Sequence, residues 1–139
     1  MTKVKTILVL NMGMKSIRSI IFDESGNKLA SCSMPIETSL TGEMVTQLPA
    51  EWWEKACKVI RECLLDVDNI PIDYLTVTSS SSCIVCVDRY GEALMPCMMV
   101  SDRRAGAESD FISKTARYPE TAKAAELGMD LSLMLPKAL

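Results

Sequence analysis

The feature that most constrains the fold of this 139-residue chain is an amphipathic stretch at residues 49–67, set between short apolar segments. Pro49 suits the first turn of a helix, and Glu51 adds a favourable negative charge there. The paired tryptophans Trp52 and Trp53 would anchor this helix to the core, with a ligand contact as the alternative. Apolar residues recur at helical spacing and predict a buried face made of Trp53, Ala56, Ile60, Cys63, Leu64 and Val67.

Short runs rich in apolar and β-branched residues flank this helix, and such runs are typical of buried strands. The predicted strands lie at residues 6–10, 17–22, 28–36, 74–78, 83–87, 93–94 and 97–100. The D-x-x-G sequences at 23–26 and 88–91 each predict a hairpin turn, because glycine accepts a positive φ. We expect residues 37–46 to form an irregular connector, and further helices to cover 101–116 and 121–127.

This order of elements predicts the fold class. Tight turns join antiparallel strands, whereas a long helix between two strands makes them parallel neighbours. We therefore predict an α/β fold with a mixed, five-stranded sheet and helices packed against it. A chain of 139 residues is long enough to form one domain with its own core.

The composition excludes several classes of function. There is no histidine, which rules out Ser-His-Asp and Cys-His catalysis and histidine-ligated metal sites. The net charge is −3 and the longest basic cluster is Arg103-Arg104, so we expect no nucleic-acid partner. Neither a run of about 18 apolar residues nor a signal-peptide pattern is present. We predict a cytoplasmic protein without a membrane partner.

The cysteines favour structural roles over chemistry. Cys83 and Cys86 have C-x-x-C spacing, but in a strand residues i and i+3 point to opposite faces. Free cysteine is usually buried, so we expect buried free thiols and no metal site. A cysteine-based zinc module is the alternative, and metal analysis would decide it. The six cysteines are Cys32, Cys57, Cys63, Cys83, Cys86 and Cys97.

The loop that follows the first predicted strand is a candidate anion site. Ligands of mixed α/β sheets tend to bind where loops leave the strand ends. Such a turn can hold phosphate through backbone N–H groups and a nearby cation, although an ordinary tight hairpin is the alternative. The candidate residues are Asn11, Gly13, Lys15, Ser16 and Arg18.

Two further loops carry groups that suit hydroxyl-rich ligands. The serine run at 79–82 includes Ser80 and Ser82, whose hydroxyls could bind a sugar or simply cap a turn. Asp102 and Arg104 could hold a polyol through paired hydrogen bonds. The alternative for Asp102 is a helix N-cap, in which the carboxylate accepts backbone N–H bonds.

Five motifs in register give the chain a family resemblance. They are NMGMKSIR at 11–18, DESG at 23–26, QLPAEWW at 47–53, TSSSSC…DRYGEAL at 78–94 and VSDRR at 100–104. In this order and spacing the chain resembles the N-terminal part of the FGGY carbohydrate kinases, whose patterns are D-x-G-T-[ST]-S-x-[RK], D-x-x-G, Glu-Trp-Trp, T-G-Q-x-x-G…D-x-x-G-x-P-L and W-x-D-x-R. The resemblance implies an actin-like ATPase fold of the ribonuclease H-like type, here incomplete.

The resemblance also implies a function. FGGY kinases transfer a phosphoryl group from ATP, with magnesium, to a hydroxyl of a sugar or polyol, in a cleft between two domains. The first loop would face the phosphates, and Asp102, Arg104 and more weakly Ser80 and Ser82 would face the sugar. The general base and the second, nucleotide-binding domain come later in such chains. We therefore expect residues 1–139 to be a truncated N-terminal domain with no catalytic residue, no tightly bound cofactor and no turnover alone.

Several positions depart from the family pattern. Asn11 replaces an aspartate and is a poorer ligand for magnesium. Met14 replaces a threonine whose hydroxyl would face phosphate, and Val100 replaces a tryptophan that lines the sugar pocket. The matching positions are Gly13, Ser16, Arg18, Asp102 and Arg104. These departures support an alternative, a degenerate kinase-like domain that binds or interacts without catalysis. An apolar surface left by missing sequence would favour homo-oligomers.

Overall fold

The computed structural model describes residues 4–115 and 137–138, which belong to two units. The first unit consists of Met1–Glu37 and Leu48–Ser80, and the second of Thr38–Gln47 and Ser81–Leu139. The first contains β1 (Thr6–Met12), β2 (Ser16–Asp23), β3 (Lys28–Pro35), α1 (Pro49–Leu65) and β6 (Tyr74–Ser79). The second contains β4 (Ser39–Thr41), β5 (Met44–Gln47), β7 (Cys97–Met98) and α2 (Gly106–Thr115).

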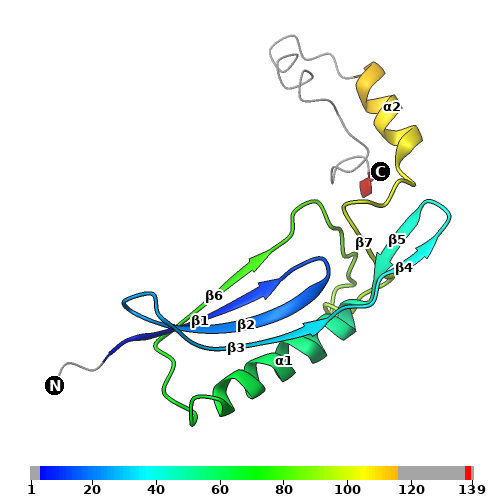
Figure 1. The fold of residues 1–139 in the computed structure, drawn as a ribbon. Helices are drawn as coiled ribbons and strands as arrows, with labels where there is room; N and C mark the ends of the chain where they lie inside the picture. Colours follow the sequence, from blue (N-terminus) through cyan, green and yellow to red (C-terminus); the bar gives the residue numbers. More distant parts are fainter. Residues whose placement is uncertain (1–3, 116–136, 139) are drawn as a thin grey trace. The chain divides into compact units, whose positions relative to one another are not determined.

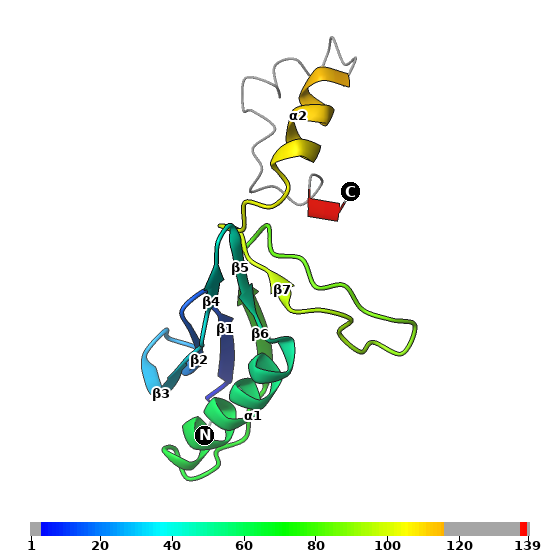
Figure 2. The same ribbon diagram turned by 90° about the vertical axis from the view of Figure 1, so that its right-hand side faces the viewer.

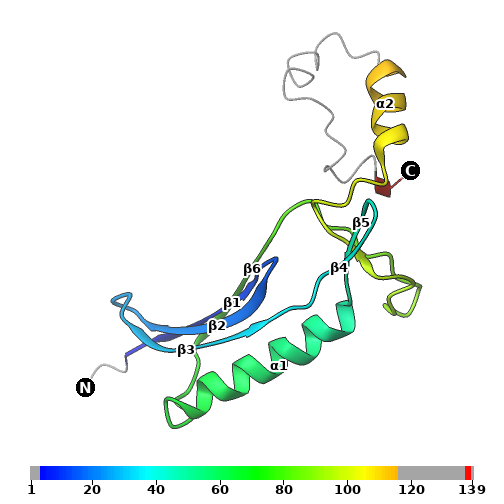
Figure 3. The same ribbon diagram turned by 45° about the vertical axis from the view of Figure 1, so that its right-hand side comes forward.

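The first unit is a four-stranded mixed sheet with α1 along one face (Figures 1 and 3). The strand order is β3-β2-β1-β6; β2 is antiparallel to β1 and β3, whereas β6 is parallel to β1. The predicted crossover is confirmed, because α1 directly precedes β6 in the chain and β6 pairs in parallel with β1. The mixed α/β class is therefore confirmed, with β6 at one edge of this sheet.

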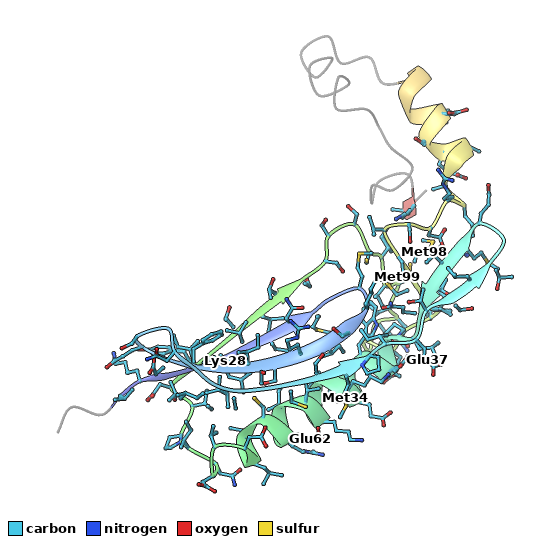
Figure 4. All side chains as sticks on the ribbon, viewed as in Figure 1. Lys28, Met34, Glu37, Glu62, Met98 and Met99 are labelled. Atoms are coloured by element: carbon cyan, nitrogen blue, oxygen red, sulfur yellow. The ribbon has the colours of Figure 1, made fainter. Side chains whose placement is uncertain are left out.

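The core of the first unit lies between this sheet and α1. Alternate residues of β1 and β2 point to the helix side, since side chains alternate across a strand. Met34 on β3, labelled in Figure 4, packs against the same cluster. The buried members are Leu8, Leu10, Ile17, Ile21, Ala30, Ile36, Ala56, Val59 and Cys63.

The buried face of α1 agrees with the predicted one except at the paired tryptophans. Trp53 is 74% exposed, so its prediction as a core anchor was wrong, whereas Trp52 is half-buried against the core. The buried residues Ala56, Val59 and Cys63 continue the spacing set by Trp52, which lies about 100° around the helix from Trp53. Ile60, Leu64 and Val67 pack against the core as predicted, so the predicted face is confirmed except at Trp53, and Val59 was not predicted. The helix also ends at Leu65, two residues before the predicted boundary.

The two D-x-x-G turns have the same local geometry, as predicted. In both, the glycine N–H donates to the aspartate carbonyl, at 3.0 Å for Gly26 and 3.1 Å for Gly91. Both glycines have positive φ, 81° and 86°. The side chains of Asp23 and Asp88 accept backbone N–H bonds two and four residues later.

The second unit corrects the prediction of one five-stranded sheet. It has its own three-stranded antiparallel sheet in the order β4-β5-β7, shown in Figure 2. Residues 37–46, predicted as a connector, contain β4 and part of β5. The predicted strands at 83–87 and 93–94 form only the isolated bridges Ile84–Met98 and Val87–Ala93. Pro96 lacks an N–H donor, and β7 begins directly after it.

The last described helix begins later than predicted. α2 starts at Gly106 rather than near residue 101, and Asp102 lies in a turn before it. Asp102 is therefore not the N-cap of this helix, which was the alternative prediction. The predicted helix at 121–127 lies outside the described residues. In the described part of the chain, no helix combines the length and apolarity needed to cross a membrane.

The cysteines are free, but most are not buried. Cys63 and Cys97 are buried, Cys32, Cys57 and Cys83 are half-buried, and Cys86 is exposed. The expectation of buried thiols therefore holds for two of them. Across residues 4–115 and 137–138, no three or more Cys, Asp or Glu residues are grouped as a metal site.

Candidate functional site

A row of polar side chains crosses the sheet of the first unit near the end of β1. Asn11 on β1 lies directly opposite Arg18 on β2 and opposite Thr78 on β6. Ser33 on β3 continues the row beside Arg18. Paired residues on neighbouring strands point to the same face. The buried neighbour Ile17 points to the α1 side, so this row lies on the opposite face of the sheet.

The β1–β2 turn next to this row leaves little space for a side chain at Gly13. The Gly13 N–H donates to the Ser16 carbonyl at 3.1 Å. A Cβ at Gly13 would lie 3.1 Å from Asn11 Oδ1 and 3.1 Å from the Ser16 carbonyl oxygen. The amide oxygen of Asn11 therefore lies over the turn. Close approach of these atoms, rather than a positive φ, favours glycine here.

The cationic side chains of this group are accessible. Lys15 and Arg18 are exposed, and Ser16 is half-buried. The Lys15 carbonyl accepts the Ile36 N–H at 3.0 Å, which fixes the tip of the turn against the end of β3. The structure therefore brings Asn11, Gly13, Lys15, Ser16 and Arg18 into one local group around the β1–β2 turn. The positive charges of Lys15 and Arg18 are exposed to solvent.

The second unit holds a buried carboxylate, Asp102, which is fully shielded from solvent. Its Oδ2 accepts the Val45 N–H of β5 at 2.9 Å. The guanidinium of Arg104 donates from Nε to Oδ1 at 3.0 Å and from Nη2 to Oδ2 at 2.9 Å, a two-point ion pair. The Arg104 N–H adds a bond to Oδ1 at 3.2 Å. Asp102 therefore fixes the orientation of Arg104, whose own side chain is 32% exposed.

These bonds keep both partners charged. Burial alone would raise the pKa of the Asp102 carboxyl, but hydrogen bonds from Arg104 and from the Val45 N–H outweigh it and hold the pKa below its ordinary value. The hydrogen bonds to Asp102 raise the pKa of Arg104. Asp102 is thus an ionised, inward-facing carboxylate, while the outer part of the Arg104 guanidinium is available to a ligand.

The serine run is divided between the two units. Ser80 belongs to the first unit, and its N–H donates to the Met12 carbonyl at 3.3 Å. Ser82 belongs to the second unit and has a φ of 61°, a left-handed conformation that costs energy for a residue with a side chain. Its carbonyl accepts a hydrogen bond from Lys137 at 3.1 Å.

Some residues of these groups were not predicted as site residues. Thr78 joins the polar row because it lies opposite Asn11 in the parallel pairing of β1 and β6. The sequence could have indicated this only if that pairing had been known. Val45 contributes its backbone N–H, a group that every residue except proline has, so its residue type does not indicate this role. Lys137 lies 37 residues along the chain from Val100, so no local spacing connects them.

Comparisons with known proteins agree on one family. A sequence model described as the FGGY family of carbohydrate kinases, N-terminal domain, matches residues 6–137. The chain is 33% identical over 111 residues to an autoinducer-2 kinase of Klebsiella pneumoniae and 30% identical over 110 residues to one of Yersinia enterocolitica. Each match covers 73% of this chain but only 20% of the relative, so the chain spans about a fifth of these curated relatives.

Solved structures support the same fold. The xylulose kinase of Rhodospirillum rubrum has a TM-score of 0.86 at 22% identity, covering 96% of this chain and 28% of that one. A Plasmodium falciparum glycerol kinase with ADP has a TM-score of 0.87 at 17% identity, with the same coverages of 96% and 28%. At these identities the likeness shows the fold alone, which is that of the sugar kinases with their actin-like, ribonuclease H-like architecture.

Proposed function

The chain belongs to the FGGY family of carbohydrate kinases, and we propose on that premise that it is the N-terminal part of an enzyme that transfers a phosphoryl group from ATP to a sugar or polyol hydroxyl. The observation that carries the proposal is the polar row with Asn11 and Arg18 beside the tight Gly13 turn. FGGY kinases use ATP and magnesium in general. The relatives and solved structures named above are kinases of autoinducer-2, xylulose and glycerol.

The first unit provides groups that fit the phosphates of ATP. Lys15 and Arg18 are exposed cations beside the β1–β2 turn, and such cations can pair with phosphate oxygens. Bound ATP supplies the phosphoryl group, and magnesium neutralises its charge. The fit to magnesium is weaker, because the Asn11 amide is a neutral ligand where a hard cation prefers carboxylate.

The second unit provides groups for the acceptor. We propose that Arg104 donates hydrogen bonds to sugar hydroxyls and that Asp102 acts by holding the guanidinium in place, because its own oxygens are buried and hydrogen-bonded. The Ser82 hydroxyl and, more weakly, that of Ser80 would add contacts. In this proposal the partly exposed Arg104 contacts the sugar directly, and the buried Asp102 does not.

We propose that residues 1–139 alone have no turnover, since no general base is assigned to them. The test is a coupled ADP-release assay over a panel of xylulose, glycerol and autoinducer-2, run on this chain and on the complete gene product. The proposed function expects turnover only from a gene product that supplies the base and the second domain. Turnover by the purified 139-residue chain would contradict it.

A specific observation favours a second candidate, a kinase-like domain that binds without catalysis. The Asn11 side chain lies over the turn, where an aspartate would bring a charge toward magnesium. Calorimetry with MgATP on the complete gene product separates the two. Tight, magnesium-dependent nucleotide binding supports the kinase, and its absence supports the binding domain. Asn11→Asp is expected to raise magnesium affinity, with Asn27→Asp, in an exposed turn, as the control.

We also propose a cytoplasmic location and self-association. The support for self-association is the exposed apolar surface of the edge strand β6, where Leu75 is 61% and Val77 is 53% exposed. A second copy of the chain is the proposed partner, and neither nucleic acid nor membrane is. Light scattering after size exclusion would test this, and a monomer at high concentration would contradict it. Leu75→Ser should lower any dimer fraction.

A further inference from the structure

Lys137 is a buried cation enclosed by backbone carbonyls. The residue is only 7% exposed. Its Nζ donates hydrogen bonds to three backbone carbonyl oxygens. The distances are 3.1 Å to Ser82, 2.7 Å to Met99 and 3.2 Å to Val100. A lysine ammonium has three N–H donors, and backbone carbonyls are good acceptors for them. Such hydrogen bonding is what makes a buried charge tolerable.

The three carbonyls come from two segments that carry candidate sugar-binding groups. One segment contains Ser82, and the other runs from Met99 into the Asp102 turn. The Met99 carbonyl also accepts the Asp102 N–H at 3.0 Å, so Lys137 and Asp102 share one acceptor. The Met99 carbonyl therefore links Lys137 to the backbone of Asp102, the residue that orients Arg104.

The conformation of Ser82 gives a second reason to regard this contact as specific. Its φ of 61° is unfavourable for a residue other than glycine, and such a conformation persists only where surrounding structure enforces it. The bond from Lys137 to the Ser82 carbonyl supplies that restraint. The neighbouring Cys97 thiol stays neutral, because burial raises its pKa to about 12. Cys97 therefore does not supply an anionic partner to the ammonium.

We propose that Lys137 is a positioning residue for the acceptor side of the site, which ties the Ser82 loop to the Asp102 turn and so sets where Arg104 and Ser82 meet a sugar. The inference rests on the proposed function and extends it. Lys137 does not contact the reacting atoms; it acts through the backbone of two loops. Its removal should therefore weaken sugar binding while leaving nucleotide binding at the first unit unchanged.

The test compares Lys137→Met with Lys58→Met in the complete gene product. Lys58 is exposed on α1 and belongs to no candidate site, so its variant controls for the loss of a lysine. Calorimetry measures the affinity for the panel compound that binds most tightly among xylulose, glycerol and autoinducer-2, and separately for MgATP. Lys137→Met is expected to lower the sugar affinity roughly tenfold, as suits a charged hydrogen-bond cluster, with MgATP affinity unchanged. Unchanged sugar affinity would overturn the proposal.

Amide hydrogen exchange separates positioning from a general loss of structure. Lys137→Met should speed exchange at the Asp102 N–H roughly tenfold and leave the amides of β1 and β2 at wild-type rates. Faster exchange throughout both units would mean a merely structural lysine and would overturn the proposal. If the wild type binds no panel compound, the proposed substrate class fails, and this exchange measurement alone decides the inference about Lys137.

Lys137→Arg decides the matter if Lys137→Met does not fold. The guanidinium keeps the positive charge, but its planar fork cannot direct its donors as a single ammonium nitrogen does. We expect a folded protein whose sugar affinity falls roughly threefold to tenfold, with MgATP affinity unchanged. Wild-type sugar affinity together with wild-type exchange at Asp102 would overturn the proposal.

Discussion

The two units of this chain are stabilised in different ways. In the first, apolar side chains such as Ile17 and Val59, both fully buried, fill the space between one sheet and α1. In the second, β7 spans only two residues, and fully or nearly buried polar groups, Asp102 and Lys137, connect the loops around it. Apolar packing is non-directional, whereas a hydrogen-bonded charge fixes the position of each partner.

This difference suits the roles proposed for the two units. A sheet with a packed helix supplies a rigid edge on which Asn11 and Arg18 are fixed by strand register. Loops have no ladder to fix them, so the candidate sugar groups depend on Asp102 and Lys137 instead. Buried charges cost desolvation energy, and a chain that retains them gains defined geometry in exchange. Removing one such group from each unit tests this difference.

The largest expected effect is loss of packing in the first unit. Ile17→Ala removes a fully buried side chain between β2 and α1 and should lower the free energy of unfolding by about 3–4 kcal/mol. Denaturant unfolding followed by tryptophan fluorescence measures it, since Trp52 packs on this core. Ile20→Ala, half-buried on the opposite face, is the matched control and should cost about 1–2 kcal/mol. Equal losses would contradict a core confined to the helix side.

Asp102→Asn should produce the next largest effect, in the second unit. The amide keeps the shape but removes the charge that pairs with Arg104, so we expect a loss of about 3 kcal/mol. Amide exchange should report it at Val45, whose N–H loses an ionised acceptor, rather than in β1 or β2. Glu92→Gln, an exposed carboxylate in the same unit, is the control and should change stability very little. A loss spread over both units would argue against separate stabilisation.

The same contrast decides how much the sequence could predict. The first unit follows from periodicity, because alternating strand residues and a 3.6-residue helical repeat leave their pattern in the chain. Even there, the exposed Trp53 was placed in the core, since either of the two adjacent tryptophans fits the helical spacing to Ala56. The D-x-x-G turns were predictable because the hydrogen-bond partners of Asp23 and Asp88 lie within four residues along the chain.

The second unit depends on contacts that no local pattern encodes. Residues 83–87 have the β-branched composition of a strand but form only two isolated bridges, Ile84–Met98 and Val87–Ala93. Asp102 was selected as a site residue from its motif, yet its burial against the Val45 N–H comes from a strand 57 residues earlier. Lys137 binds carbonyls, which every residue carries, so nothing in the sequence marks its partners.

Acid should weaken the second unit at Asp102. The hydrogen bonds at Asp102 lower its pKa in the folded chain below the ordinary value near 4, so its ionised form stabilises the fold above about pH 4. That contribution is lost as the pH falls through the folded-state pKa. Exchange at Val45 should therefore rise in acid in the wild type but change little with pH in Asp102→Asn. Parallel pH profiles for the two proteins would contradict this assignment.

The smallest expected effect compares two left-handed residues, one from each unit. Ser82 has a φ of 61° and Asn69 a φ of 55°. Glycine adopts such angles without strain, so Ser82→Gly should stabilise the protein by about 0.5 kcal/mol after its unfolded-state entropy is counted. Asn69→Gly should change less, because asparagine tolerates this region and its N–H already bonds the Leu64 carbonyl at 2.8 Å. Thermal unfolding measures both. A destabilised Ser82→Gly protein would mean that the serine hydroxyl, and not only its carbonyl bond to Lys137, holds this loop.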